Sequence, residues 1–507
     1  MIDPTDRYVS RRDFIKISGA FGVALGAVGG GASTALGASD QVAAALGQPA
    51  GGTAEARNMD LVGFVSLQAR SCYQPLVHHY TTGGQDKWIF FGGNHGGEAL
   101  NPLTGQIEPN GTGLVDVSDP SNPKYLSHIP GAPGGTEAGG AQMVRVVDGK
   151  SLPQGDPNKV YLLRTFGSDG HQVYDVTDPT HPERLTTIIT GLDGTHKNWW
   201  EPDTGIAYLV CDGRGEGWRT NRMTKVYDLS NPASPRFIRN FGLVGQEPGS
   251  TMAPVPAGVH GPIARGNRVY YAYGTSSEGV IQILDREKLL NGNPESSDPF
   301  DDTPENLLYP QIGRLDMNPQ WGAHTTFPVL GMRIADFATD REGALRDFLV
   351  VPSEATQNEC QSVRHLTFMV DITNEAKPFS VATYEVPESS GNFCSRGGRF
   401  GPHATSESFA APYYGKLIFI SYFNAGVRTV DIRDPFNPRE VGFFIPPVTA
   451  ETDKRCITVG GAEQCKVAIQ TNNVEYDERG FIYIVDRANT GLHILKLSGD
   501  AQRIAAA

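Results

Sequence analysis

The chain has 507 residues and an acidic balance, with 43 Lys and Arg against 56 Asp and Glu and a formal net charge of −13. This charge argues against nucleic acid and anionic membrane surfaces as partners, because both repel an acidic protein. Histidine is scarce, with 12 residues, and none of the six cysteines falls in a paired CxxC spacing typical of zinc sites.

The first 38 residues have the pattern of an export signal. Paired arginines in Ser10-Arg11-Arg12-Asp13-Phe14 precede an apolar, Gly- and Ala-rich stretch from Ile17 to Leu36. The pattern resembles a twin-arginine signal, a receptor-read address that is excluded from fold reasoning. A membrane anchor is disfavoured by the weakly hydrophobic composition. We expect a signal over 1–38, a flexible linker over 39–57, and a periplasmic or extracellular protein without membrane insertion after processing.

After the linker, the chain repeats an apolar strand that ends in a hydrophobic-Asp-hydrophobic triplet followed by a turn. Clear and degenerate copies begin at Val115, Tyr174, Tyr227, Ile281, Val370, Val430 and His493. Asp at a strand end bonds to nearby backbone amides and Pro fixes φ, so the chain reverses after each copy. Further β-branched and aromatic runs precede each copy. The pattern predicts an all-β fold, a seven-bladed β-propeller with about four strands in each blade.

The two ends of the repeat region predict how the ring closes. The stretch Leu61-Val62-Gly63-Phe64-Val65 matches the strand that follows the sixth turn, Val441-Gly442-Phe443-Phe444. The last repeat stops after its third strand, near Leu497. We expect the N-terminal strand to complete the seventh blade, which removes a sheet edge. The propeller would cover 58–499 and leave a tail over 500–507.

A second repeat places a polar residue two positions after glycine or its equivalent, just ahead of an apolar strand. Its members are His78, Gln142, His196, His260, His324, His403 and Asn473. The innermost strand of a propeller blade begins at one mouth of the central channel, so these side chains are expected to converge there.

Converging imidazoles predict a metal site. The candidate ligands are His78, His79, His196, His260, His324 and His403. Without obvious thiolate or multi-carboxylate partners, copper is expected first, from its place in the affinity order and the exported setting, and iron second. The alternative is that these polar residues hydrogen-bond to water in the channel.

The hydrophobic-Asp repeat resembles that of the LVIVD-repeat β-propellers over nearly everything after the leader, which implies the fold and says little about activity. In its histidine placement alone, the chain is similar to metal-binding propellers: the methanethiol oxidase/selenium-binding group, carotenoid-cleaving oxygenases and copper-cluster enzymes. That likeness implies a metal-dependent oxidoreductase acting on a small molecule. No CxxCH haem attachment occurs, so any electron carrier must be a separate protein.

Turns on the predicted histidine side supply candidates for catalysis. Glu354 and Arg214 lie between second and third strands, and Glu201 follows His196 by five residues; we assign these three acid–base or anion-binding roles. His95 and His171 occupy similar turns and are interpreted as turn residues rather than ligands. The alternatives to an oxidoreductase are a non-enzymatic LVIVD-repeat surface protein and a hydrolase that uses metal-bound water.

The six cysteines fit an oxidising compartment. Cys456 and Cys465 bracket a short loop, and Cys360 and Cys394 flank one blade region, so two disulfides are predicted. Cys72 and Cys211 remain, either bridged or buried.

Overall fold

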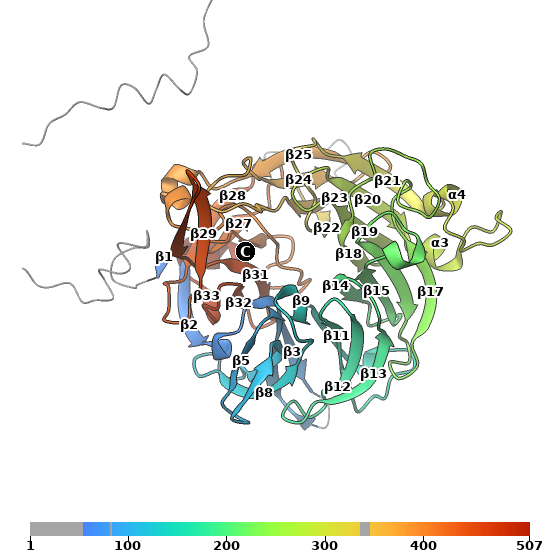
Figure 1. Cartoon of the computed structure of the whole chain (residues 1–507). Coiled ribbons are helices and arrows are strands. Elements are labelled where there is room, and N and C mark those ends of the chain that lie inside the picture. The colour runs from blue at the N-terminus through green and yellow to red at the C-terminus, as the bar shows by residue number, and fades with distance from the viewer. Residues whose placement is uncertain (1–53, 82–83, 335–344) are drawn as a thin grey trace, which may run out of the picture. The chain divides into compact units, whose positions relative to one another are not determined.

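The computed structural model describes residues 54–81, 84–334 and 345–507 (Figure 1). The predicted leader and all but the last four residues of the predicted linker lie outside the described residues. The described chain forms seven sheets of four or five strands set around a central axis, so the all-β, seven-bladed prediction is confirmed.

The first three blades run in chain order from the inside outward. The first contains β3 (Cys72–Tyr80), β4 (Lys87–Gly96), β7 (Gly111–Asp116) and β8 (Lys124–Pro130), with β9 (Thr136–Ala141) paired to β4. The second contains β10 (Val144–Asp148), β11 (Val160–Phe166), β12 (Gly170–Asp175) and β13 (Glu183–Ile189). The third contains β14 (Thr195–Trp200), β15 (Ile206–Cys211), β16 (Met223–Asp228) and β17 (Arg236–Phe241).

The next two blades follow the same order. The fourth contains β18 (Val259–Arg265), β19 (Arg268–Tyr273), β20 (Val280–Asp285) and β21 (Gln311–Asp316). The fifth contains β22 (Phe327–Met332), β23 (Arg346–Pro352), β24 (Thr367–Asp371) and β25 (Phe379–Tyr384).

The last two blades take outer strands from the start of the chain. The sixth contains β26 (Leu417–Ser421), β27 (Val427–Asp431), β28 (Arg439–Ile445) and, at its edge, β1 (Glu55–Arg57). Its inner segment is irregular and meets β26 through a bridge between Thr405 and Ile420. The seventh contains β31 (Thr471–Tyr476), β32 (Phe481–Asp486), β33 (Leu492–Leu497) and β2 (Met59–Val65). Since β2 pairs with β33, the predicted closure by the N-terminal strand is confirmed.

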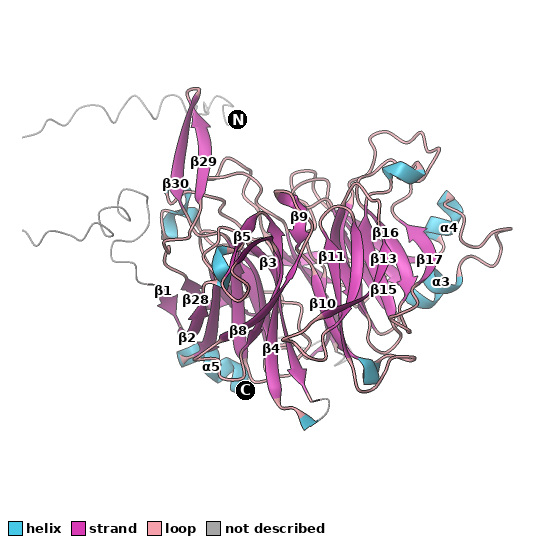
Figure 2. Cartoon of the chain, turned by 60° about the horizontal axis from the view of Figure 1, so that its bottom comes forward, coloured by secondary structure: helices cyan, strands magenta, loops and turns pink. Residues whose placement is uncertain are grey.

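Smaller elements decorate the ring. Two hairpins are formed by β5 (Glu98–Asn101) with β6 (Gln106–Pro109) and by β29 (Lys454–Val459) with β30 (Ala462–Val467). The described helices are α3 (Arg286–Asn291), α4 (Pro304–Leu308) and α5 (Gly499–Ala506), with single 3-10 turns at Leu67–Ala69, Gly149–Ser151, Arg214–Glu216, Glu388–Ser390 and Phe393–Ser395. The β29–β30 hairpin projects from one face of the ring, and α5 lies toward the other (Figure 2).

Two predicted boundaries shift. The chain joins the propeller already at Glu55, because β1 pairs with β28. The predicted tail over 500–507 belongs almost entirely to α5, which packs against the sixth blade and accepts a hydrogen bond from Lys416 Nζ at Ala505 O, 2.8 Å away. Its partly buried Ile504 and Ala505 make this helix part of the core rather than a free tail.

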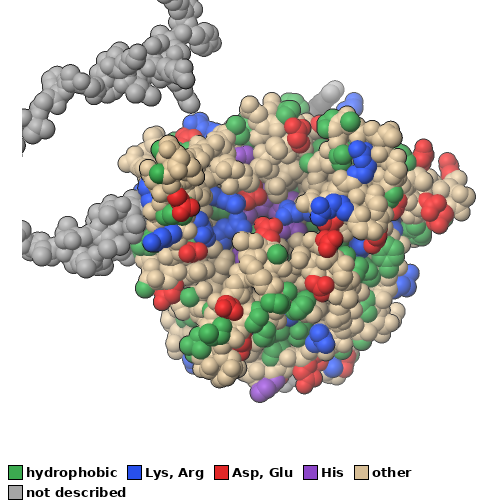
Figure 3. Space-filling model, in the orientation of Figure 1, with side chains coloured by type: hydrophobic (Ala, Val, Ile, Leu, Met, Phe, Trp, Pro, Cys, Tyr) green, Lys and Arg blue, Asp and Glu red, His purple; other side chains and the backbone are tan. Residues whose placement is uncertain are grey.

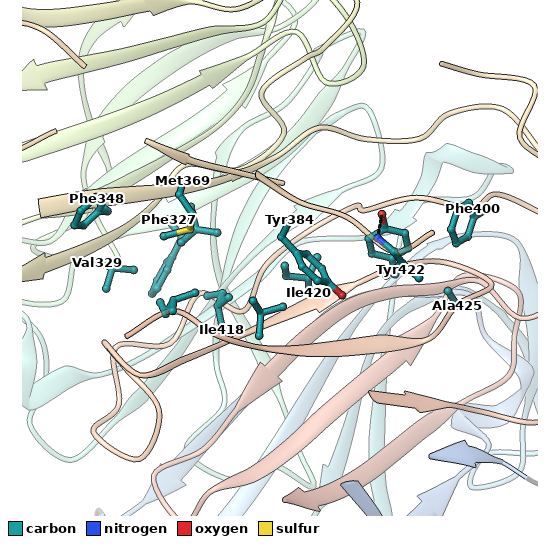
Figure 4. Close-up of a cluster of buried hydrophobic side chains, with 14 of the residues drawn as sticks. Phe327, Val329, Phe348, Met369, Tyr384, Phe400, Ile418, Ile420, Tyr422 and Ala425 are labelled. Carbon is teal, nitrogen blue, oxygen red and sulfur yellow. Dashed lines mark hydrogen bonds between the residues drawn. The ribbon is translucent and has the colours of Figure 1, made fainter. Parts of the chain in front are cut away.

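Apolar contacts between neighbouring blades hold the ring together. Figure 4 shows the cluster in which Phe327 and Phe348 of the fifth blade pack with Ile418 and Ile420 of the sixth. All five residues of β26 are buried, which explains why its sequence is a continuous apolar run ending in Ser421.

The repeated Asp closes the turn as expected. For example, Asp116 accepts a hydrogen bond from the backbone N–H of Ser118 at 2.9 Å, and Asp371 accepts one from Thr373 at 2.9 Å. These turns lie at the end of each third strand.

Both predicted disulfides, Cys360–Cys394 and Cys456–Cys465, are confirmed. Cys72 and Cys211 are free and buried.

Candidate metal centre

Each blade contributes one side chain to a ring at the start of its innermost strand. The members are Tyr73, Gln142, His196, His260, His324, His403 and Asn472. We call this end of the channel the histidine mouth. In Figure 3, histidine and arginine side chains gather in a hollow at the centre of this face.

Backbone irregularities turn these side chains toward the axis. The pairing between the first and second strands skips one residue at Tyr73, at His260 and at Asn472, and His196 lies within a similar interruption of β14. A bulge breaks the alternation of side chains along a strand and re-aims the extra residue. The residue before each pleated run can therefore point into the channel.

The glycine that precedes His324 is required by close backbone approach. At Gly322, a Cβ atom would lie 1.5 Å from the carbonyl oxygen of Gly274. No side chain fits at that distance, so the repeated glycine reflects packing of the loop that presents His324.

Four imidazoles from consecutive blades form a contiguous cluster. Nε2 of His196 lies 2.7 Å from Nε2 of His260. The ring centroids of His260 and His324 are 3.6 Å apart, and those of His324 and His403 are 4.3 Å apart. All four side chains are buried. Within this histidine cluster, His324 and His403 have the spacing of ligands to one ion, because their ligand atoms and one of Glu354 lie within 4.8 Å of one another.

Hydrogen bonds at the outer nitrogens orient two of the imidazoles. Nδ1 of His403 donates to the backbone carbonyl of Asn472 at 2.5 Å, which leaves Nε2 as the lone-pair nitrogen facing inward. Nδ1 of His196 lies 3.3 Å from the Gln142 amide nitrogen and 3.7 Å from a carboxylate oxygen of Glu137. At His403 the second ring nitrogen donates, as is common in metal-ligating histidines, whereas at His196 Nδ1 accepts from the Gln142 amide.

Inside the cluster, polar atoms lack protein partners. Nε2 of His324 and Nδ1 of His260 are buried and make no hydrogen bond among the described residues. Burial lowers the pKa of His196, His260, His324 and His403 well below its usual value, with nearby cationic groups adding to the effect. The imidazoles are therefore neutral at pH 7, and facing lone pairs at 2.7 Å repel each other unless a proton or a cation lies between them.

Tyr73 and His95 complete the wall of the cluster. The Tyr73 ring makes edge contacts with His95, His196 and His403, and its hydroxyl lies 3.4 Å from Nε2 of His260. His95 is held by Ser71 Oγ at Nδ1 and accepts a hydrogen bond from Arg487 at Nε2, 3.2 Å away. Both ring nitrogens of His95 are thus engaged, so His95 orients its neighbours rather than facing the cluster with a free lone pair.

Carboxylates and guanidinium groups form the rim. Glu354 lies 3.8 Å from Nε2 of His403, and its ligand atom is within 4.8 Å of those of His324 and His403, close enough for a shared ion. Burial raises the pKa of Glu354, although Arg399, which donates to it at 2.7 Å, opposes the shift.

Glu137, the second carboxylate of the rim, has a pKa shift in the opposite direction. Burial alone would raise the pKa of Glu137, but Arg222, His95 and Arg487 together lower it, so this side chain stays ionised. Arg222 donates to Glu137 at 3.0 Å.

Two predicted ligands do not reach the cluster, and their assignment to the ring is wrong. β3 begins at Cys72, so Tyr73 and not His78 takes the ring position in the first blade. His78 is five residues further along the strand, roughly 16 Å away at 3.3 Å per residue. It pairs with Asp148 at 3.2 Å, while His79 stacks on Trp88 and bonds to Asp86. The ring position in the seventh blade is likewise Asn472 rather than Asn473.

The structure separates the three predicted catalytic residues. Only Glu354 lies at the cluster. Glu201 follows β14 at its other end, where it accepts hydrogen bonds from Arg286 and Thr204. Arg214 is largely exposed and is bound by Asp212. The placement of Glu201 and Arg214 at the site is therefore wrong, because the first strand carries Glu201 away from the mouth and Asp212 holds Arg214 outside it.

Sequence reasoning missed Tyr73, Glu137, Arg222, Arg399 and Arg487, and it interpreted His95 as a turn residue. One signal was available. His95, Glu354 and Arg487 all lie at or just after the end of the second strand of their blades, in the turn that returns to the histidine mouth. Tyr73 lies in β3 and Glu137 in β9, whereas Arg222 and Arg399 come from loops with no repeated motif.

Comparison with known proteins locates the repeat. The family model of the LVIVD repeat matches residues 109–128, which include the first hydrophobic-Asp triplet and strand β7. The chain carries an LVIVD repeat. No curated protein matches this LVIVD-repeat propeller over its sequence.

A crystal structure of Chaetomium thermophilum Raptor is similar in fold, with a TM-score of 0.51 and 9% sequence identity. The similarity covers 88% of this chain and 30% of that chain, so the propeller spans less than a third of the length of Raptor. At this identity the likeness shows the fold alone.

The two disulfides fit an exported protein. None of the helices in the described part of the chain is long and apolar enough to cross a membrane.

Proposed function

We propose that this LVIVD-repeat propeller is an exported, metal-dependent oxidoreductase that holds copper, with iron as the alternative, at the histidine cluster and acts on a small molecule at the histidine mouth. One observation carries the proposal: His196, His260, His324 and His403 are buried, neutral and in mutual contact, and two of their nitrogens have no protein partner.

A shared cation is the simplest explanation of that contact. Leaving buried polar atoms without partners costs about 1–3 kcal/mol each. Channel water would supply hydrogen bonds, but it does not explain why four imidazoles from consecutive blades are in contact rather than spread around the ring. A bound ion would accept lone pairs from neighbouring members, and the ligand atoms of His324, His403 and Glu354 lie close enough together to share it.

The donor set favours copper, with iron as the alternative metal. Imidazole nitrogen without thiolate suits copper, which also leads the affinity order. Two histidines with one carboxylate are typical of iron sites, and Glu354 lies beside His324 and His403 in that arrangement. When bound, either metal would supply one-electron chemistry at the floor of the cavity.

The protein groups around the cluster have separable roles. Asn472 and Gln142 hold His403 and His196 with their Nε2 atoms inward. Glu354, whose pKa is raised by burial, can exchange a proton with a substrate at the mouth, and Arg399 fixes its position. Tyr73 covers the cluster and excludes bulk water from it.

The disulfides support export, and the paired arginines of residues 10–14 support the twin-arginine route to the periplasm or beyond. Electrons would pass to dioxygen or to a separate carrier protein.

Metal analysis of the full chain, purified after export by a bacterial host, tests the proposal. We expect about one copper or iron ion per chain, with an optical or paramagnetic signal, and loss of both in His260→Asn. His181→Asn, which changes an exposed histidine, should keep the full metal content. Thermal unfolding of each variant checks that the fold survives, and His403→Gln provides a second disruption of the cluster.

Other outcomes would redirect or reject the proposal. Stoichiometric zinc would favour a hydrolase that uses metal-bound water. A folded protein without any metal would favour a non-enzymatic surface protein. Retention of copper in Glu354→Gln would select the all-histidine site, whereas loss of iron in that variant would select the mixed site.

A further inference from the structure

A cavity of about 1000 Å³ opens at the histidine mouth. Its wall includes His95, Glu137, Arg399 and Arg487, and the β29–β30 hairpin forms one side. Glu137 connects the cavity to the cluster, because one of its oxygens is 3.7 Å from Nδ1 of His196. Glu137 and His95 thus lie between a molecule bound in the cavity and the buried imidazoles, and the volume suits a small ligand.

Arg487 is the least satisfied cation on this wall. Its guanidinium group makes one hydrogen bond among the described residues, to Nε2 of His95 at 3.2 Å. The nearest carboxylate oxygens, on Glu137 and Glu354, are 3.9 and 4.0 Å away, too far for hydrogen bonds. A guanidinium group carries five N–H donors, so most of those on Arg487 face the cavity without a protein acceptor.

A second guanidinium group stands close to the first. Burial lowers the pKa of Arg399, and repulsion from Arg487 lowers it further. Arg399 donates one hydrogen bond to Glu354 and also lines the cavity. Two cations held near one another in a partly buried wall are stabilised by an anion placed between them.

The charges of the wall are mixed in sign. The cavity is lined by Arg399, Arg455 and Arg487 and by Glu98, Glu137, Asp453 and Glu463. At its edge, Arg222 pairs with Glu137 and Arg399 pairs with Glu354. An anion would therefore be selected by the N–H donors of Arg487 and not by an excess of positive charge.

We infer that the substrate of this site is a small anion bearing a carboxylate or an inorganic oxyanion group, which Arg487 and Arg399 bind through its oxygens. This inference rests on the proposed function and specifies the substrate class. The planar fork of a guanidinium group matches two oxygens of such a group. Neutral molecules of the same shape would leave Arg487 unpaired.

Calorimetric titration of the full mature chain with acetate, sulfate and the neutral analogue acetamide tests the inference. We expect acetate or sulfate to bind at least about tenfold more tightly than acetamide. We expect Arg487→Gln to lower the affinity for the anion by about tenfold or more. Arg487→Lys should recover part of the affinity, because it restores the charge without the fork. Arg236→Gln removes an exposed arginine that pairs with Asp228 outside the mouth, and it should bind as the unmodified protein does.

Running each titration on metal-loaded and chelator-treated protein separates the two proposals. Anion selectivity that depends on Arg487 supports the inference, including the case in which no metal binds and only the proposed oxidoreductase fails. Equal binding of acetate and acetamide, equal affinity in Arg487→Gln and Arg236→Gln, or no binding of either anion overturns the inference even when the metal is present.

Discussion

The two ends of the central channel differ in how completely their buried polar groups are paired with other protein groups. At the far mouth, lined by Trp199, Arg265, Phe409 and Tyr476, the cations Lys197 and Arg145 both pair with Glu407. At the histidine mouth, within the described part of the chain, His260 and His324 each have a nitrogen without a partner and the guanidinium group of Arg487 makes a single hydrogen bond.

The difference indicates where a ligand is needed. Buried charges are tolerated when they pair, because the mutual attraction offsets the lost hydration. At the far mouth, Lys197 and Arg145 both reach the carboxylate of Glu407, so each cation has a protein partner. At the histidine mouth, the partners of the imidazoles and of Arg487 are incomplete among the described residues, and this distinguishes a binding site from structural polarity in the same channel.

The far mouth also contains a carboxyl group that stays neutral. Burial, with the neighbouring Glu407, raises the pKa of Glu475 to about 8. Glu407 itself remains ionised, because Lys197 and Arg145 outweigh the effect of burial and lower its pKa. One carboxylate and one carboxylic acid thus sit beside two cations.

The largest expected effect comes from breaking the paired end. Glu407→Gln leaves Lys197 and Arg145 buried without a counter-charge, and we expect a loss of about 3–5 kcal/mol in the free energy of unfolding. Denaturant titration followed by tryptophan fluorescence measures it. Glu388→Gln, which breaks a partly exposed pair with Arg364, should cost within about 1 kcal/mol. Equal losses in the two variants would contradict the contrast drawn between buried and surface pairs.

A second effect, of similar size, should appear in the pH dependence of stability. The unfolded Glu475 loses its proton near pH 4.5, whereas the folded protein retains it up to about pH 8. Between these values the folded state binds the extra proton, so the contribution to stability is complete below pH 4.5 and lost as pH rises to 8. The difference in pKa corresponds to a fall of about 5 kcal/mol in the free energy of unfolding, and we expect Glu475→Gln to remove it.

Unfolding midpoints from pH 4.5 to 9 for both proteins provide the measurement. Parallel curves for Glu475→Gln and the unmodified protein would show that Glu475 is ionised throughout and that its burial does not control its titration.

The smallest expected effect concerns His78, which the sequence repeat predicted to lie in the ring. His78→Asn removes a partly exposed pair with Asp148, so stability should fall by no more than about 1 kcal/mol. Metal content should stay at the level of the unmodified protein, unlike that of His260→Asn. Loss of metal in His78→Asn would place His78 in the cluster and contradict the register of β3.

Periodic features of the fold were predictable from the sequence. The hydrophobic-Asp triplets give the number of blades, and the match between residues 61–65 and 441–444 gives the closure, because each depends on local turn chemistry and strand alternation. Four of the five histidines expected at the axis also reach it, since glycine and a short loop precede each of them.

Register within the first blade could not be predicted in the same way. β3 has nine residues, and both His78 and Tyr73 precede or lie in apolar runs. Only the pairing of Cys72 with Asn94 shows which of them starts the strand. Arg222 and Arg399 are also unpredictable, because each comes from a loop with no repeat, and the proximity of all three arginines of the mouth depends on how distant blades meet.

The sequence alone determined that this protein is a closed ring of seven β blades with histidines at the start of several inner strands, because strand periodicity and turn residues act locally. Only the tertiary structure decided which polar groups meet. It placed Tyr73 among the imidazoles, gathered Arg222, Arg399 and Arg487 from three blades, and paired Lys197 with Glu407 across the channel. Those contacts follow from ring closure, which brings together side chains hundreds of residues apart.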